Sequence, residues 1–151
     1  MVPLRNLPLL NTTAGAWGFW VSMESQKKYN RCFSFEFFPP NTAEGAQKLA
    51  QTAKQLAQLK PEFFSVTYGA GGSTRDRTID IVTRIKRDTG IDSMAHLTCV
   101  GSTKEELKVV LDRLVDAGVE NVLALRGDPP GGGAFQPTPG GFEFSSELVL
   151  S

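Results

Sequence analysis

The sequence predicts an α/β fold in which short apolar strands alternate with amphipathic helices. Four strand–helix units are expected, with strands beginning near residues 33, 62, 93 and 120. A spacing of about thirty residues suits a right-handed βαβ crossover. Both a doubly wound sheet and a (β/α)8 barrel use such units. No GxGxxG motif follows the first strand, so the barrel is favoured. A complete barrel needs about 250 residues, so this chain of 151 residues would supply only the first four units of a truncated barrel.

The first half of the pattern is bounded by proline and glycine. A Phe-rich strand over 33–38 ends at two prolines, which cannot continue a sheet ladder. The helix expected over 44–59 has one apolar face, and the strand at 63–68 runs into a glycine-rich loop. A helix over 75–89 should end at Gly90. The residues expected on the buried faces of the two helices are Ala46, Leu49, Ala50, Ala53, Leu56, Ala57, Ile79, Val82 and Ile85.

The second half repeats the pattern. A strand over 94–100 precedes a helix whose capping box is either Ser102 with Glu105 or Thr103 with Glu106. A strand over 121–126, a Gly/Pro-rich loop over 127–141 and a last helix from 144 to 150 follow. The helix before Gly118 should bury a stripe made of Leu107, Val110, Leu111, Leu114 and Val115.

Composition excludes several classes of protein. Hydrophobic residues make up 40% of the chain and charged residues 21%, which is typical of a globular domain. Sixteen basic residues balance sixteen acidic ones, so no net field favours a nucleic acid or an anionic membrane. Two isolated cysteines, Cys32 and Cys99, predict free thiols in the cytoplasm. A single histidine, His96, argues against a metal site.

Residues 1–30 are expected to be an extension outside the domain formed by 31–151. Their apolar residues are too interrupted for a membrane helix or a secretory signal. Met23 opens a polar stretch typical of a translation start, so the residues before it are interpreted as a mis-assigned extension, or else as disordered. A transit peptide is the weaker alternative, because only Arg5 is basic before Met23.

Polar side chains stand where each strand ends. The four strands offer, in order, Glu36, Thr67, His96 with Thr98, and Arg126 with Asp128. The carboxyl ends of barrel strands meet at one mouth, where active sites form. The pattern therefore predicts an enzyme rather than a structural module.

Each of these residues also has a plainer explanation. Glu36 beside phenylalanine rings should be desolvated, which raises the pKa of a carboxyl and suits a general acid, but it could equally bind backbone amides. Asp128 could be a turn or ion-pair residue, and His96 a core histidine. The loop 69–72 could hold an anion. The charged run over 75–77 is expected to be a solvated first helical turn.

Four blocks together resemble the methylenetetrahydrofolate reductase family: FSFEFFPP at 33–40, SVTYGAGGSTRDRT at 65–78, AHLTC at 95–99 and ALRGDPPGG at 124–132. The resemblance implies a (β/α)8 barrel that binds FAD. It implies reduction of 5,10-methylenetetrahydrofolate to 5-methyltetrahydrofolate, with NADH or NADPH as reductant. A homo-oligomer is plausible for the full-length enzyme.

The resemblance also implies roles for single residues. Glu36 corresponds to the general acid that helps to protonate N10 of the folate. Asp128 corresponds to an aspartate near the flavin pyrimidine edge that also holds the pterin. Thr67 corresponds to a residue at the nicotinamide and flavin site. The remaining positions that match flavin contacts are Tyr68, Ala70, His96, Arg126, Gly127, Phe144 and Ser145.

Two alternatives stay open. The chain could be an inactive fragment, because the family's second half carries further flavin contacts and a glutamine that grips folate and nicotinamide. Alone, it is then expected to bind FAD weakly and to turn over negligibly. It could also be a pterin-binding barrel methyltransferase, which needs no flavin.

Overall fold

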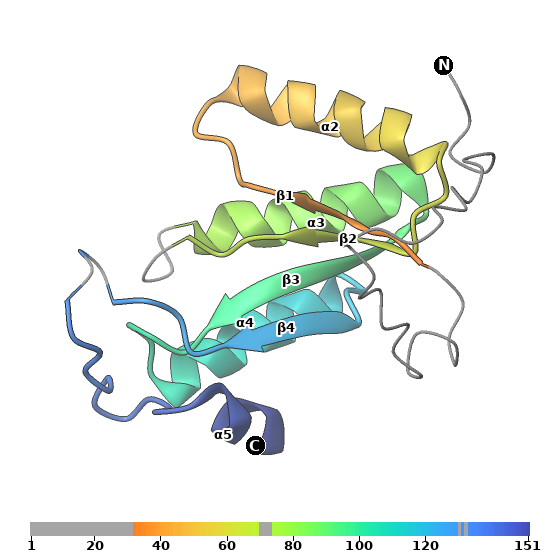
Figure 1. Cartoon of the computed structure of the whole chain (residues 1–151). Helices are drawn as coiled ribbons and strands as arrows, with labels where there is room; N and C mark the ends of the chain where they lie inside the picture. Colours follow the sequence, from red (N-terminus) through yellow and green to blue (C-terminus); the bar gives the residue numbers. More distant parts are fainter. Residues whose placement is uncertain (1–31, 70–73, 130, 132) are drawn as a thin grey trace, which may run out of the picture. The chain divides into compact units, whose positions relative to one another are not determined.

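The computed structural model describes residues 32–69, 74–129, 131 and 133–151. They contain a parallel sheet whose strands follow chain order (Figure 1). The strands are β1 (Phe35–Phe37), β2 (Phe63–Val66), β3 (Asp92–Thr98) and β4 (Asn121–Leu125). The helices are α2 (Ala43–Ala57), α3 (Arg75–Thr89), α4 (Lys104–Asp116) and α5 (Ser145–Leu150). The predicted alternation is confirmed, and the sequential order of the parallel strands is the one that a (β/α)8 barrel uses.

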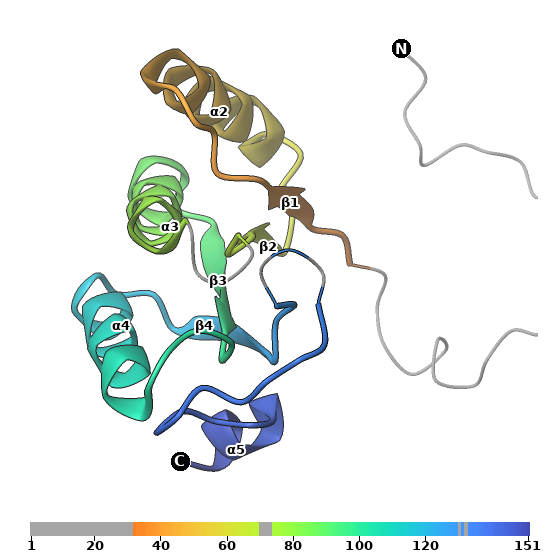
Figure 2. The ribbon, with the colours of Figure 1, turned by 90° about the vertical axis from the view of Figure 1, so that its left-hand side faces the viewer.

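The two faces of the sheet have different surroundings. Figure 2 looks at the carboxyl ends of the strands and shows α2, α3 and α4 along one side of the sheet. The connection from β4 to α5 runs on the opposite side. We call the side covered by the helices the helix face, and the opposite side the inner face. In a closed barrel the inner face becomes the interior.

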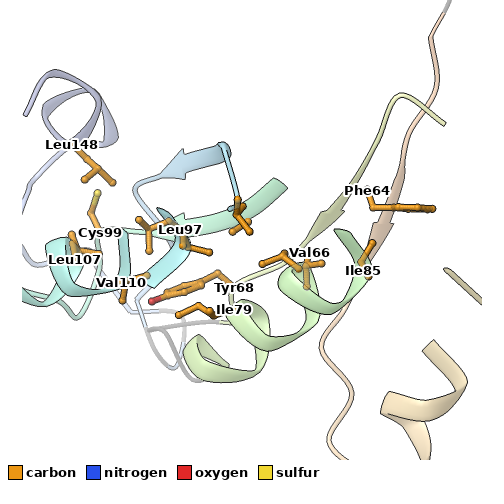
Figure 3. Close-up of a cluster of buried hydrophobic side chains, with 14 of the residues drawn as sticks. Phe64, Val66, Tyr68, Ile79, Ile85, Leu97, Cys99, Leu107, Val110 and Leu148 are labelled. Carbon is orange, nitrogen blue, oxygen red and sulfur yellow. The ribbon is translucent and has the colours of Figure 1, made fainter. Parts of the chain in front are cut away.

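The helix face holds the hydrophobic core. Phe64 and Val66 of β2 and Leu97 of β3 have no exposed surface. They point toward residues of α3 and α4 (Figure 3). At about 25 cal/mol per Å² of buried apolar surface, this packing is the main stabilising contribution to the fold. The helix residues in the same cluster are Ala53, Ile79, Val82, Ile85, Leu107, Val110 and Leu114.

Helix ends show which of the predicted signals operate. The Thr103 side chain accepts a hydrogen bond from the Glu106 N–H at 3.2 Å, and the Glu106 carboxylate accepts one from the Thr103 N–H at 2.8 Å. The second of the two predicted capping boxes is therefore the one used. Gly90 ends α3 with φ of +69°, as expected for a left-handed C-cap.

Three predictions about elements are wrong in detail. β3 spans Asp92–Thr98 rather than 94–100. β1 has three residues rather than six, although the Phe33 carbonyl before it still accepts a hydrogen bond from the Glu62 N–H at 2.9 Å. Val115 was expected in the core, yet it is 71% exposed. The contact line of α4 passes through Leu107, Val110 and Leu114, and the next residue turns about 100° away from it.

The expectations for residues 1–30 lie outside the described part of the chain. Among the described residues, no helix has the length and apolar character needed to cross a lipid bilayer.

Candidate active site

Glu36 lies on the inner face of β1, as the alternation predicts. Its neighbours Phe35 and Phe37 point to the helix face, where their ring centroids lie 6.1 and 5.5 Å from that of Phe64. The Glu36 side chain is 48% exposed. The phenylalanine rings therefore pack on the opposite face of β1. Among the described residues they do not shield the Glu36 carboxylate from solvent, as the sequence had led us to expect.

His96 of β3 shares the inner face with Glu36. Its Nε2 lies 3.4 Å from Glu36 Oε2, and its side chain is 10% exposed. Burial lowers the pKa of His96, and the nearby Glu36 carboxylate opposes this only in part. The imidazole is therefore neutral at pH 7. The structure thus joins two of the predicted site residues directly.

Two threonines extend this polar surface toward the carboxyl ends of the strands. The Thr67 N–H donates to the Phe37 carbonyl at 3.0 Å, and the Thr67 carbonyl accepts from the Thr78 hydroxyl at 2.8 Å. Thr98 is buried, and its Oγ1 has no hydrogen-bond partner among the described residues. A buried hydroxyl without a partner costs about 1–3 kcal/mol, which a water or a ligand atom can offset.

The segment after β4 places Arg126, Gly127 and Asp128 beyond the sheet. Arg126 Cζ lies 4.6 Å from the centroid of the Phe135 ring, a cation–π contact. Gly127 has φ of +83°, and a Cβ there would lie 2.6 Å from Val100 Cγ1. Asp128 is exposed and forms no ion pair within the described residues. Phe135 was not predicted; its only signal is an aromatic residue inside a Gly/Pro-rich loop.

The side chain of Tyr68 lies on the helix face rather than the inner face (Figure 3). Its hydroxyl accepts a hydrogen bond from Arg75 Nε at 3.0 Å, while Arg75 Nη2 donates to Ser102 Oγ at 2.7 Å. Burial raises the pKa of Tyr68, and Arg75 opposes the shift. A contact between Tyr68 and a ligand on the inner face would therefore come from its main chain.

The prediction of a solvated turn at 75–77 is correct for Asp76, whose side chain is 74% exposed, but Arg75 and Arg77 are half-buried. Besides the contacts of Arg75, Asp76 pairs with Arg113 of α4 at 2.6 Å. Arg77 donates to Asn41 Oδ1 at 2.7 Å. The turn therefore faces solvent at Asp76, and its three charged side chains also bond α3 to neighbouring segments.

Phe144 and Ser145 lie at the start of α5. The Glu147 carboxylate accepts hydrogen bonds from the N–H groups of Glu143 and Phe144, at 2.8 and 3.3 Å. Leu148 packs near Cys99 on the helix face (Figure 3). No hydrogen bond or ion pair within the described part of the chain joins Phe144 or Ser145 to Glu36. Ala70 and most of the loop 69–72 lie outside the described residues.

Comparison with known proteins decides the family. The sequence matches the family profile described as "Methylenetetrahydrofolate reductase" over residues 22–151. The chain belongs to this family. Methylenetetrahydrofolate reductases are TIM barrels, which agrees with the parallel units of the structure.

Relatives within the methylenetetrahydrofolate reductase family come from plants and bacteria. The chain is 42% identical over 118 residues to "Methylenetetrahydrofolate reductase (NADH) 1" of Arabidopsis thaliana, covering 78% of this chain and 20% of that protein. It is 48% identical over 101 residues to "5,10-methylenetetrahydrofolate reductase" of Escherichia coli strain K12, covering 66% of this chain and 34% of that protein. The chain thus spans a fifth to a third of the length of these reductases.

A groove of about 380 Å³ also lies in the helix layer of this chain, between α2 and α3. Ala46, Leu49 and Ile81 are among its apolar residues, and Arg77 and Asp88 are among its charged ones. It is on the opposite side of the sheet from Glu36 and His96. Among the described residues, no three His, Cys, Asp or Glu side chains gather as metal ligands.

Proposed function

We propose that this chain supplies the first part of an active site that reduces 5,10-methylenetetrahydrofolate to 5-methyltetrahydrofolate. NADH or NADPH would be the reductant and FAD the bound redox cofactor. The observation that carries the proposal is the pairing of Glu36 with His96 on the inner face, 3.4 Å apart. The Arabidopsis relative is named as an NADH-dependent methylenetetrahydrofolate reductase, which supports the same substrate and reductant.

The inner face has groups that suit a flavin. The Thr98 hydroxyl is buried without a hydrogen-bond partner among the described residues, so a ligand atom can supply that partner. Side chains of Thr67, His96, Arg126 and Asp128 would hold the flavin. Main-chain groups of Tyr68, Ala70 and Gly127 would join them, with Phe144 and Ser145 farther along the chain. FAD, when bound, supplies hydride transfer between nicotinamide and folate.

Glu36 is the proposed general acid. In its protonated form it donates its proton to N10 of the folate, and the bond from N10 to the bridging methylene group then breaks. The side chain is half-exposed on the inner face, so a substrate can reach it. A positioned acid contributes about 10²–10⁴-fold to the rate of such a step.

Asp128 has a separate proposed role. It is exposed at the carboxyl end of the sheet, next to Gly127. Its carboxylate would accept hydrogen bonds from the pterin and, as a fixed negative charge, would disfavour an anionic reduced flavin.

We also propose a cytoplasmic location for this enzyme. Both cysteines, Cys32 and Cys99, are free thiols, which suits a reducing compartment.

The test uses a polypeptide whose reading frame extends beyond Ser151 to the length of the relatives. Its absorption spectrum should show a flavin that NADH or NADPH bleaches and methylenetetrahydrofolate restores. In Glu36→Gln, NADH or NADPH should still bleach the flavin, but methylenetetrahydrofolate should not restore it. Glu62→Gln should behave as the wild type, because Glu62 precedes the amino end of β2, away from the carboxyl ends of the strands.

Two other results would favour the alternatives. A folded, colourless protein without activity would support the inactive fragment, and a colourless protein that transfers methyl groups would support the methyltransferase. For the chain of 151 residues alone, tight stoichiometric FAD would contradict our expectation of weak binding.

A further inference from the structure

The contact between Glu36 and His96 joins two strands that are not neighbours. Strands in a sheet lie about 4.8 Å apart, so β1 and β3 are separated by about 10 Å across β2. Glu36 lies beside Ser65 in the register, and Ser65 lies beside Met94. His96 is the next inner-face residue of β3. The small side chain of Ser65 leaves space above β2 in which the imidazole and the carboxylate meet.

The two partners are held unequally. His96 lies in the middle of a seven-residue strand paired on both sides, and its side chain is 10% exposed. Glu36 lies on a three-residue strand, and its side chain is 48% exposed. Of the pair, the imidazole is therefore the anchored group and the carboxyl is the group that can turn.

The charge state of His96 suits a hydrogen bond to the Glu36 carboxyl. Burial lowers the pKa of the imidazole, so near neutral pH it carries no charge. A neutral imidazole has one N–H donor and one lone pair. With its proton on Nε2, the imidazole can therefore donate to a carboxylate, or to the carbonyl oxygen of a carboxylic acid whose O–H stays free for the folate. The inner-face neighbours on the adjacent strands, Ser65, Thr67 and Leu123, are uncharged, while Arg126 and Asp128 follow the end of β4.

We propose that His96 is a positioning residue for Glu36, and that its buried imidazole holds the carboxyl over the inner face both before and after proton donation. The role of Glu36 as an acid rests on the proposed function, whereas the contact itself does not. This role is additional to the flavin contact proposed for His96 above.

The contact can be tested in the chain of 151 residues, because His96 is its only histidine. An NMR titration of the imidazole carbon-bound protons then reports on one residue. Glu36→Gln removes the charge that opposes the effect of burial, so the pKa of His96 should fall below that of the wild type. Glu62→Gln removes an equal charge at the other end of β2 and should leave the titration unchanged. Equal titrations in wild type and Glu36→Gln would overturn the proposal.

Positioning is tested in the polypeptide extended beyond Ser151, with two substitutions at one site. His96→Gln keeps a side-chain donor and acceptor, whereas His96→Leu keeps neither. With saturating folate, His96→Leu should slow reoxidation of the reduced enzyme by at least about tenfold and alter its pH profile, with a smaller change in KM. His96→Gln should restore most of the rate. Equal rates in the two variants would overturn the positioning role.

The two arms separate this inference from the proposed function. If the extended wild type does not reduce the folate, the proposed function fails, and the contact is judged by the titration alone. A lower His96 pKa in Glu36→Gln would then still support the pair, and an unchanged one would overturn it.

Discussion

Gly127 should be intolerant of any side chain, for two separable reasons. Its φ is +83°, where an alanine costs about 1–2 kcal/mol. A Cβ would also lie 2.6 Å from Val100 Cγ1 and 2.7 Å from Thr98 Cβ, both on the carboxyl-terminal side of β3. Overpacking of this kind costs about 1–3 kcal/mol. Gly127→Ala should therefore lower the free energy of unfolding by about 2–5 kcal/mol.

Gly140→Ala provides the matched control. Gly140 has φ of +75°, but a Cβ there would meet nothing within 4 Å. This variant should lose only the backbone contribution, about 1–2 kcal/mol. Urea denaturation followed by far-ultraviolet circular dichroism measures both losses, provided that the slope m stays constant. Equal losses in the two variants would refute the argument from close packing.

A double-mutant cycle tests the contact itself. Val100→Ala removes Cγ1, the nearest of the atoms that would clash. Gly127→Ala should therefore cost less in the Val100→Ala background than in the wild type. A coupling of at least about 0.5 kcal/mol is expected for residues in contact. Strict additivity would show that Val100 does not restrict this position.

Three further predictions concern the core, the histidine and the thiols. Leu97→Ala should lower the free energy of unfolding in urea by about 3 kcal/mol, because Leu97 is fully buried. Leu123→Ala should lower it by less than about 1 kcal/mol, because Leu123 is partly exposed. Since burial lowers the pKa of His96 below its ordinary 6.5, the unfolded chain binds the proton more readily, so stability should fall as the pH drops through the window just below 6.5. His96→Gln should flatten that dependence in urea titrations between pH 5 and 8, and an unchanged slope would exclude His96 as its source. In the native state a thiol reagent should modify Cys32 quickly and Cys99 only on unfolding. Cys99 is buried, burial raises the pKa of its thiol, and the nearby Glu147 carboxylate raises that pKa further. Mass spectrometry of timed samples would show the order of modification.

The elements of this fold were predictable because each has a local signal. Periodicity of three to four residues identifies α3 and α4, and Gly90 and the Thr103 capping box mark helix ends. Alternation along β1 correctly placed Glu36 opposite the phenylalanine rings. These signals depend on residues within one turn or one strand.

The contacts between elements were not predictable in the same way. The meeting of Glu36 with His96 depends on strand register and on the small size of Ser65, which no local pattern encodes. Arg75 resembles a surface residue in the sequence, yet it bonds Tyr68 because β2 ends beside the first turn of α3. The stacking of Arg126 on Phe135 likewise depends on the course of a long loop.

The order of strands in the sheet has a consequence for how the chain folds. Each strand pairs with the one that precedes it in the sequence, and each pairing closes a loop containing a single helix. The entropic cost of loop closure is therefore similar at every step and never requires a distant partner. As the polypeptide leaves the ribosome, β2 can dock on β1, and β3 on β2, before the next strand emerges. Growth from one edge in this manner exposes only one newly formed strand edge at a time to unintended pairing.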